Sequence, residues 1–262
     1  MTQDSWRGAE AYERYVGRWS RPVAAEFVRW LHLPDGLAWV DVGCGTGALA
    51  SAILRLAAPR RVRGYDLSPQ HVEGARAYVR DPRAEFAVAD AVALPDPPHA
   101  CDAAVSGLVL NFVPEPARAV EEMRRVSRPG GTVAVYVWDY AGEMQLMRVF
   151  WDAAVELDPA AAPLDEGRRF PLCAPDALRE TFESAGLRDV RLRAIEVPTR
   201  FADFDDYWTP FLGGQGPAPG YAVSLDEERR EALRERIRQR LPFAPDGSIG
   251  LSARAWAVRG IA

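Results

Sequence analysis

The chain has 262 residues, 48% of them hydrophobic and 26% charged, and its 32 basic and 37 acidic side chains give a net charge of −5. This composition is typical of a globular protein, and the acidic balance argues against nucleic-acid binding through bulk charge. The sequence contains no lysine, so every basic residue is an arginine. Schiff-base catalysis, a Walker phosphate loop and a kinase active site all need lysine and are therefore excluded.

The segment through Ser20 mixes charged and aromatic residues, without the apolar stretch of a signal peptide or membrane anchor. No run approaches the ~18 apolar residues of a transmembrane helix. The three cysteines are far apart and form no Cys-x-x-Cys pair, which argues against a zinc site. We therefore expect a cytoplasmic protein with reduced thiols, no metal and no membrane partner.

Strands and helices alternate over the first two thirds of the chain, a pattern that buries a parallel sheet between helices. Apolar runs predict strands at 37–42, 61–67, 85–89, 102–106 and 132–138. Helix formers between them predict helices at 48–58, 69–80 and 114–127, the second capped by Ser68 with Pro69 in its first turn. Residues 128–131, Arg-Pro-Gly-Gly, predict a turn.

The last third of the chain has a different pattern. It predicts a helix at 175–185, an edge strand at 187–197 and a closing strand at 249–258. Residues 213–220, GGQGPAPG, predict a loop, and Ser224 with Glu227 predicts a capping box for a helix whose charged face is mixed in sign. Nucleic-acid binding by that face is thus not expected.

A glycine loop, Asp41-Val42-Gly43-Cys44-Gly45-Thr46-Gly47, joins the first predicted strand to its helix. Glycines let a ligand lie against backbone, and the following helix N-terminus offers unpaired N–H groups. The loop also fits the dinucleotide pattern Gly-x-Gly-x-x-Gly/Ala through Gly43, Gly45 and Ala48. At this point the loop is compatible with either a dinucleotide or another ligand with acceptor groups.

Two further acids follow the next strands: Asp66 ends the second and Asp90 the third. In a doubly wound sheet these strand ends converge on one crevice, so Asp41, Asp66 and Asp90 are expected around one ligand. Three carboxylates suit a pyrophosphate poorly. They suit a ligand with an ammonium, ribose hydroxyls and an adenine amine.

Residues 40–138 resemble a class I S-adenosylmethionine-dependent methyltransferase, closest to the quinone-biosynthesis and small-molecule group. The resemblance lies in VDVGCGTGALA, in RGYDLSPQHVEGAR, in FAVADAVALP, in RRVSRPGGTVAVYVW and in the N-terminal AYERYVGRWS. It implies an α/β fold: a doubly wound, Rossmann-like, seven-stranded and mostly parallel sheet with an antiparallel last strand and a helical cap. It also implies one domain, with a flank at 1–36, a cofactor core at 37–138, substrate insertions at 139–174 and 200–248, and closing elements at 175–199 and 249–262.

The resemblance further implies the cofactor S-adenosyl-L-methionine, its product S-adenosyl-L-homocysteine, and a small, fairly apolar acceptor. Asp41 would lie near the ammonium, Asp66 on the ribose, Leu67 against the adenine and Asp90 on its amine. The remaining expected cofactor residues are Tyr15, Arg18, Gly43, Cys44, Gly45, Thr46, Gly47, Ala91, Ser106 and Leu108. For Cys44 the residue type also fits a small buried filler.

Methyl transfer needs orientation and at most a base. The candidates for a catalytic role are Asn111, Tyr15 and His99, although none of the three histidines falls at the carboxyl end of a strand. Asn111 could equally bond its own backbone. Polar and aromatic side chains expected to face the substrate are Trp19, Asn111, Trp138, Tyr140, Trp151, Tyr207 and Trp208.

Two other functions remain open at this stage. The glycine pattern and Asp66 also fit an NAD(P)-dependent oxidoreductase, which Asp90 and the lack of a Tyr-x-x-x-Lys pair disfavour. A module that binds S-adenosylmethionine without catalysis fits the same residues. The acceptor atom and the oligomeric state do not follow from the sequence.

Overall fold

A computed structural model of the chain describes residues 17–214 and 216–262, which form two compact units. The larger unit comprises Ser20–Trp138, Leu172–Ile195 and Ala255–Ala262. The smaller unit comprises, within the described residues, 17–19, Asp139–Pro171 and Glu196–Arg254. The expected cofactor core therefore lies entirely in the larger unit.

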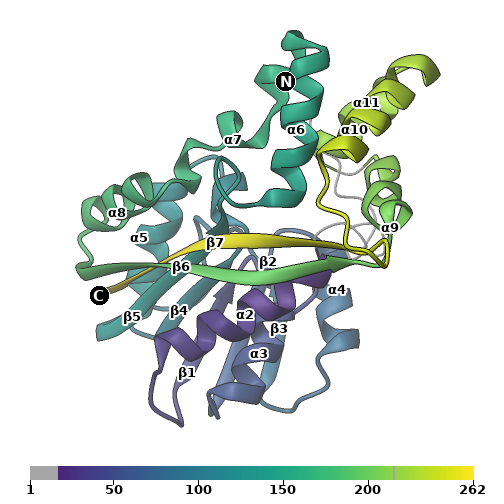
Figure 1. The fold of residues 1–262 in the computed structure, drawn as a ribbon. Coiled ribbons are helices and arrows are strands. Elements are labelled where there is room, and N and C mark those ends of the chain that lie inside the picture. The colour runs from purple at the N-terminus through teal and green to yellow at the C-terminus, as the bar shows by residue number, and fades with distance from the viewer. Residues whose placement is uncertain (1–16, 215) are drawn as a thin grey trace. The chain divides into compact units, whose positions relative to one another are not determined.

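The larger unit is built on a parallel sheet of mostly buried strands (Figure 1). Its strands pair in the order β3-β2-β1-β4-β5, with bounds β1 (Ala38–Val42), β2 (Arg61–Asp66), β3 (Ala84–Val88), β4 (Cys101–Gly107) and β5 (Ser127–Trp138). β7 (Ile249–Ile261) pairs antiparallel with β5, and β6 (Arg188–Phe201) follows β7 at the edge. The expected seven-stranded, mostly parallel, Rossmann-like sheet is confirmed.

Helices pack on the strands that they connect. α4 packs against β2 and β3, while α5 packs against β4, β5 and α8. The Ser68 hydroxyl caps α4 by accepting from the His71 N–H, and Pro69 is its first residue, as predicted. The helices assigned to this part of the chain are α2 (Arg18–Leu31), α3 (Ala48–Leu56), α4 (Pro69–Tyr78), η2 (Leu110–Phe112), α5 (Pro116–Val126) and α8 (Pro175–Ser184).

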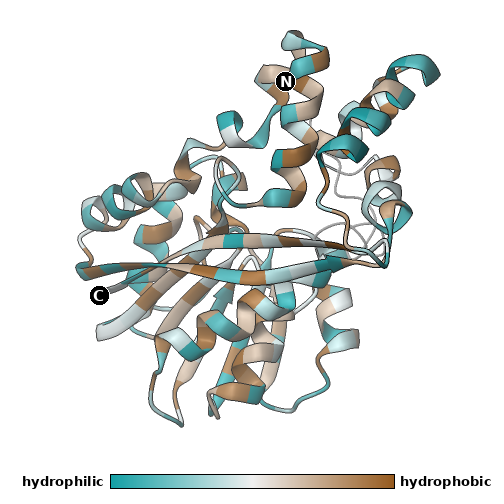
Figure 2. Cartoon of the chain, in the orientation of Figure 1, coloured by the Kyte–Doolittle hydropathy of each residue, from teal (hydrophilic) through white to brown (hydrophobic). Residues whose placement is uncertain are grey.

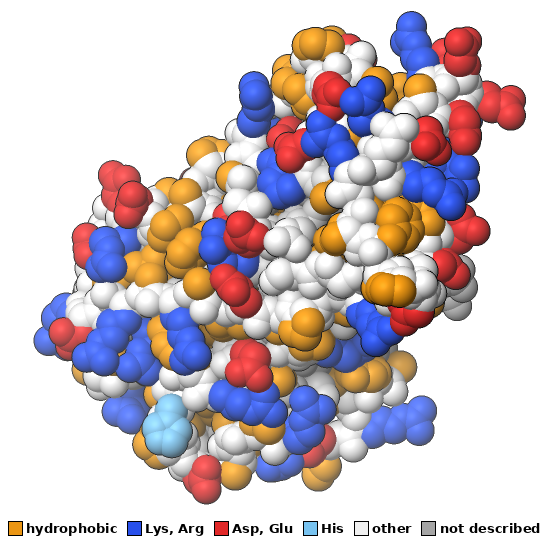
Figure 3. All heavy atoms as spheres, viewed as in Figure 1, with side chains coloured by type: hydrophobic (Ala, Val, Ile, Leu, Met, Phe, Trp, Pro, Cys, Tyr) orange, Lys and Arg blue, Asp and Glu red, His pale blue; other side chains and the backbone are white. Residues whose placement is uncertain are grey.

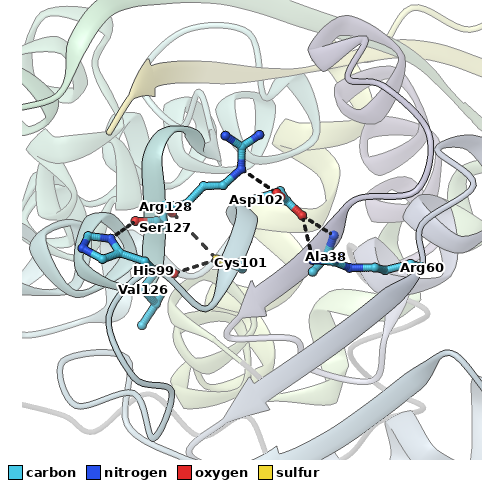
Figure 4. A network of polar contacts seen from close by, with 8 residues as sticks. All are labelled: Ala38, Arg60, His99, Cys101, Asp102, Val126, Ser127 and Arg128. Atoms are coloured by element: carbon cyan, nitrogen blue, oxygen red, sulfur yellow. Dashed lines mark hydrogen bonds and ion pairs between the residues drawn. The ribbon is translucent and has the colours of Figure 1, made fainter.

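A polar network closes the amino-terminal edge of the sheet (Figure 4). The Asp102 carboxylate accepts from the Ala38 N–H at 2.8 Å, from Arg128 Nε at 2.6 Å and from Arg60 Nη2 at 3.3 Å. β5 starts directly after α5 at Ser127, and its register with β4 shifts between Cys101 and Ala103. The turn predicted at 128–131 is therefore wrong: this segment is an irregular start of β5.

The smaller unit is largely helical, with an aromatic core. The rings of Phe150 and Phe211 stack with centroids 4.5 Å apart, and Trp151 and Tyr207 are fully buried beside them. Its helices are α6 (Gln145–Leu157), η3 (Pro159–Leu164), α7 (Glu166–Arg169), α9 (Phe204–Trp208), η5 (Thr209–Gly213), α10 (Pro217–Ser224) and α11 (Glu227–Arg240), and η4 (Pro171–Cys173) follows α7.

α11 is mainly hydrophilic apart from its buried Leu233 and Ile237 (Figure 2). Its arginines alternate with acidic residues, so both signs of charge are interspersed on the molecular face seen in Figure 3. This mixture fits the expectation of a solvated helix face. Within the described ranges, every helix is too short or too polar to span a lipid bilayer.

The predicted start of α11 is wrong. Asp226, not Ser224, is its N-cap, and the Asp226 carboxylate accepts from the Arg229 N–H at 2.8 Å. Ser224 instead ends α10, and its hydroxyl donates to the Tyr221 carbonyl. α10 itself occupies part of the predicted 213–220 loop, because Pro217 begins a helix where the glycines suggested none.

Asp226→Ala is expected to lower the free energy of unfolding by about 1 kcal/mol, since it removes the side chain that satisfies an N-terminal N–H group. Ser224→Ala, two residues away, serves as the matched control and should change stability by less than half as much. Urea denaturation of both variants measures the difference. Equal losses of unfolding free energy, or a larger loss for Ser224→Ala, would instead support the capping box predicted from the sequence.

Candidate functional site

The strand order reverses between β1 and β4, where neighbouring strands lead to opposite sides of the sheet. In open α/β sheets a ligand binds outside the carboxyl ends of the strands at such a switch point. The glycine loop follows β1, Asp66 ends β2, and residues 108–112 follow β4. The larger unit thus brings these three groups to one edge of the sheet.

The glycine loop is held by the neighbouring strand. The Gly43 and Cys44 N–H groups both donate to the Tyr65 carbonyl, at 2.7 and 2.8 Å. Gly43, Gly45 and Gly47 all have positive φ (73°, 52° and 90°), a conformation that favours glycine.

The surroundings of the loop glycines differ. A methyl group at Gly43 would lie 2.5 Å from Val109 Cγ1, and one at Gly47 would lie 2.7 Å from Val79 Cγ2. A methyl group at Gly45 would meet no protein atom within 4 Å. Gly43 and Gly47 are therefore required for packing, whereas Gly45 borders open space.

Asp41 carries a buried carboxylate. Its side chain has no exposed surface, and neither carboxylate oxygen has a hydrogen-bond partner in the part of the chain that the structure describes. Burial, with a smaller contribution from the negative charge of Asp66, raises the pKa of Asp41 to about 7. The nearby Ala50 N–H group acts in the opposite direction, although its geometry is not that of a hydrogen bond. A carboxylate that is buried in this way costs free energy unless a cation or donor joins it.

Asp66 is held in place by three donors. Its Oδ2 accepts from the Gly45 N–H at 2.9 Å, and its Oδ1 accepts from the Ser68 N–H at 2.9 Å and lies 3.1 Å from His71 Nδ1. Burial alone would raise the pKa of Asp66, but these bonds outweigh it and lower the pKa below its ordinary value. The Asp66 bond correspondingly raises the pKa of His71. Sequence reasoning did not pair His71 with Asp66.

Beyond Asp66 the edge of the sheet is apolar and exposed. Leu67 is 69% exposed and Val88 is 51% exposed, and Val88 pairs with Asp66 across β2 and β3. Asp90, next after Ala89, is exposed and accepts from the Val92 N–H through its Oδ1 at 3.1 Å. Ala91 is half-buried. This exposed apolar surface beside a carboxylate fits a flat aromatic ring that carries an amine.

The segment after β4 packs against the glycine loop through Val109. Ser106 and Leu108 are buried, and Leu108 has a φ of +62°, which is strained for a residue other than glycine. The side-chain Oδ1 and Nδ2 atoms of Asn111 are both buried and lack a hydrogen-bond partner among the described residues. Asn111 therefore does not bond its own backbone, and its amide remains available. Sequence reasoning missed Val109, because an ordinary valine in a loop carries no signal.

His99, a catalytic candidate from the sequence, lies away from the glycine loop. It precedes β4, and its Nδ1 lies 3.1 Å from the Ser127 carbonyl in the network of Figure 4. That network lies at the amino ends of the strands, the edge opposite the glycine loop. The buried Cys44 has a pKa that burial raises, which fits the small filler rather than a reactive thiol.

Five of the six expected substrate aromatics, all except Trp19, are buried within their own units. Trp138 ends β5, and Tyr140 packs on Phe170 with ring centroids 5.5 Å apart. Trp151 Nε1 donates to Glu166, and the Tyr207 hydroxyl donates to the Leu146 carbonyl at 2.8 Å. This favours packing roles for these side chains and for the buried Trp208; their contact with a substrate stays a prediction. Arg18 and Trp19 lie in the smaller unit, and Tyr15 lies outside the described residues.

A family model described as a methyltransferase domain matches residues 40–135, the segment that contains the glycine loop, Asp66, Asp90 and β4. The matched segment is a methyltransferase domain. The chain is 32% identical over 212 residues to the 2-methyl-6-phytyl-1,4-hydroquinone methyltransferase of Synechocystis, covering 74% of this chain and 65% of that protein.

Other relatives extend the comparison. The trans-aconitate 2-methyltransferase of Methylobacterium radiotolerans is 34% identical over 178 residues, or 63% of this chain and 66% of that protein. The chain thus spans just under two thirds of the length of these curated relatives. The phosphoethanolamine N-methyltransferase 2 of Haemonchus contortus, solved with phosphomonomethylethanolamine and S-adenosylhomocysteine, shares the fold with a TM-score of 0.59 at 15% identity, covering 96% of this chain and 56% of that one.

Proposed function

We propose that this chain is an enzyme that transfers a methyl group from S-adenosylmethionine to a small, fairly apolar acceptor. The observation that carries the proposal is the buried carboxylate of Asp41, which has no hydrogen-bond partner among the described residues, on the strand that leads into the glycine loop. An ammonium group would relieve both the missing hydrogen bonds and the uncompensated charge. A pyrophosphate, as in NAD(P), would add negative charge to a site that already holds Asp41 and Asp66.

The residues of the site fit the cofactor group by group. Asp41 would pair with the methionine ammonium, and the loop of Gly43, Cys44, Gly45, Thr46 and Gly47 would hold the methionine end. The oxygens of Asp66 keep acceptor capacity beyond their present bonds, because an ionised carboxylate has about four lone-pair sites. Asp66 would take the ribose hydroxyls, with its position fixed by Gly45, Ser68 and His71.

The adenine would lie on Leu67 and Val88, whose exposed apolar surface lies beside Asp66. Asp90 and Ala91 would meet its polar edge. Ser106 and Leu108, at the end of β4, would line the path toward the sulfur. These assignments extend to S-adenosylhomocysteine, which lacks only the transferred methyl group.

The cofactor would supply a methyl group already activated by a sulfonium, so the protein has to orient the acceptor and exclude water. Alignment of that kind contributes roughly 7 to 11 kcal/mol in well-ordered intramolecular reactions. Asn111 is placed to help, since its buried amide has both a donor and an acceptor without a partner among the described residues. We propose that Asn111 orients the acceptor by a hydrogen bond.

Two relatives act, by their names, on a hydroquinone and on aconitate, which supports a small acceptor for this chain. The arginines of α11 alternate with acidic residues, so this helix presents no continuous basic surface to a polyanion. This also supports a small acceptor. The three cysteines are free and buried, which supports a cytoplasmic location.

Turnover tests the activity. S-adenosylhomocysteine formation is followed with a panel of phenols, hydroquinones, amines and carboxylic acids, using the wild type, Asn111→Ala and His99→Ala. We expect turnover with at least one class, a loss of roughly tenfold or more in Asn111→Ala from the missing hydrogen bond, and wild-type rates in His99→Ala. Cofactor binding without turnover of any class would instead favour a non-catalytic binding module.

Cofactor affinity is expected to rise with pH because Asp41 must be ionised to pair with an ammonium. With a pKa of about 7, Asp41 is mostly neutral at pH 6 and mostly charged at pH 8. Calorimetric titration of S-adenosylhomocysteine between about pH 5.5 and 7.5, below the usual α-amino titration, should show tightening affinity and proton release on binding. A flat profile in the wild type would contradict the role of Asp41.

The same group sets a stability trend in the free protein. The folded pKa of Asp41 lies above its ordinary value of 3.8, so the folded state binds the proton more strongly. The stabilisation from this group is complete below about pH 4 and is lost as pH rises through 7. Thermal melts of wild type and Asp41→Asn across this range isolate the contribution, which should be absent from the variant.

A further inference from the structure

Two oppositely charged side chains of α5 hold the backbone of the loop between β3 and β4. Glu122 Oε2 accepts from the Leu94 N–H at 3.0 Å, and Arg125 Nη2 donates to the Leu94 carbonyl at 3.0 Å. Arg125 Nη1 also donates to the Asp96 carbonyl at 2.8 Å. The two side chains thus satisfy both backbone groups of Leu94, which otherwise belongs to no strand or helix.

Glu122 and Arg125 also fix each other. Arg125 Nε donates to Glu122 Oε1 at 2.7 Å, and Arg125 Nη2 donates to Glu122 Oε2 at 2.8 Å, a bidentate arrangement. These bonds lower the pKa of Glu122 and raise the pKa of Arg125, so both side chains stay charged at neutral pH. The pair therefore presents a fixed donor and a fixed acceptor to the loop.

Strand β2 holds the same stretch of the loop through a side chain. The Asp96 carboxylate has no exposed surface and forms an ion pair with Arg63 of β2. The side chain of Leu94 is buried as well. Residues 94–96 are therefore anchored twice, through their backbone to α5 and through Asp96 to β2, and every part of this anchor lies in the larger unit.

A short turn, residues 90–93, carries Asp90 between β3 and this anchor. The Ala93 N–H donates to the Asp90 carbonyl at 3.1 Å, and the Val92 N–H donates to Asp90 Oδ1 at 3.1 Å. The Asp90 carboxylate is exposed and keeps lone pairs for a further donor. Because Leu94 directly follows the turn, its attachment to α5 fixes where that carboxylate lies.

We propose that Glu122 and Arg125 are positioning residues for recognition of the base: by holding Leu94, they place the Asp90 carboxylate to accept from the exocyclic amine of adenine. The inference rests on the proposed function, in which Asp90 meets the polar edge of the cofactor's adenine. It assigns the preference for a purine that carries this amine to two residues of α5. They act through the loop and make no contact with the base themselves.

The test compares S-adenosylhomocysteine with its des-amino analogue, in which hydrogen replaces the exocyclic amine of the adenine. Both ligands are titrated calorimetrically into wild type, Glu122→Gln and Arg125→Gln. Glutamine at position 122 cannot serve both Leu94 and Arg125, because its amide nitrogen donates where the carboxylate accepts. Glu121→Gln is the matched control, since Glu121 is the preceding residue of α5 and is exposed.

Wild type should bind S-adenosylhomocysteine about tenfold more tightly than the des-amino analogue, the size of one hydrogen bond to a charged group. In Glu122→Gln and Arg125→Gln this preference should fall to about threefold or less, because the amine then meets a displaced carboxylate. Glu121→Gln should keep the wild-type preference. Arg125→Gln leaves Glu122 in place and provides the test if Glu122→Gln fails to fold.

An Asp90→Ala background shows whether the effect passes through Asp90. Asp90→Ala should bind the two ligands equally, and adding Glu122→Gln should leave their affinity ratio unchanged. A purely structural role of Glu122 would weaken both ligands alike in either background.

Three results would overturn the inference: a wild type without a preference for the amine, an unchanged preference in both α5 variants, or an effect of Glu122→Gln on the preference that persists in Asp90→Ala. Each of these would leave the proposed function intact, since S-adenosylhomocysteine still binds. A wild-type protein that binds neither ligand contradicts the proposed function itself.

Discussion

Replacing Asp41 with asparagine is expected to weaken S-adenosylmethionine binding by about 2 kcal/mol or more, roughly 30-fold, because truncating one partner of a buried charge pair leaves the other uncompensated. The substitution keeps the shape of the side chain and removes its charge. In the free protein that charge has no partner among the described residues. The thermal midpoint of the free variant should therefore equal or exceed that of the wild type, even as binding is lost.

Asp102→Asn is the control, for which we expect the opposite changes in thermal midpoint and cofactor affinity. Asp102 bonds Ala38, Arg60 and Arg128 at the far edge of the sheet (Figure 4). Its substitution should lower the thermal midpoint and leave cofactor affinity as in the wild type. If Asp41→Asn also lost stability and kept its affinity, Asp41 would be a structural residue like Asp102.

Gly43→Ala and Gly45→Ala are expected to impair different properties, stability in the first and cofactor binding in the second. Both positions have positive φ, which costs an alanine about 1 to 2 kcal/mol. At Gly43 the methyl group would also collide with Val109, which adds roughly 1 to 3 kcal/mol of overpacking. At Gly45 it would enter open space, so we expect little further loss of stability there but loss of cofactor binding.

Denaturant unfolding and cofactor titration of the two variants separate these effects. The double variant Gly43→Ala/Val109→Ala is the control: it should regain part of the stability that Gly43→Ala loses, because the collision is relieved while the φ strain persists. A Gly45→Ala protein that binds the cofactor normally would show that the open space at Gly45 holds no ligand.

The elements of the larger unit could be predicted because local signals and tertiary packing agree there. β1 is an apolar run buried along its whole length, and Ser68 with Pro69 marks the start of α4 as predicted. The capping box at Ser224 failed because Asp226, two residues on, competes for the same role. The strand β5 begins earlier than predicted because Ser127 pairs with Cys101 of β4, and Gly130 and Gly131 bond Ala262, contacts that the local sequence does not encode.

Only part of the site could be predicted, because contacts between side chains of distant segments cannot be inferred from sequence spacing. Asp41, Asp66 and the glycines end predicted strands, so their shared edge follows from the topology. The pairing of His71 with Asp66 and the contact of Val109 with Gly43 depend on side-chain directions that no spacing encodes. The ion pair of Arg18 with Asp206, 188 residues away, likewise could not be predicted from the sequence.

Calorimetric titration of S-adenosylmethionine and of NADH into the wild-type protein tests the central claim, that the edge formed by the glycine loop and Asp41 receives a cationic cofactor. We predict saturable binding of S-adenosylmethionine, one molecule per chain, and no binding of NADH. Binding of NADH without binding of S-adenosylmethionine would contradict the account.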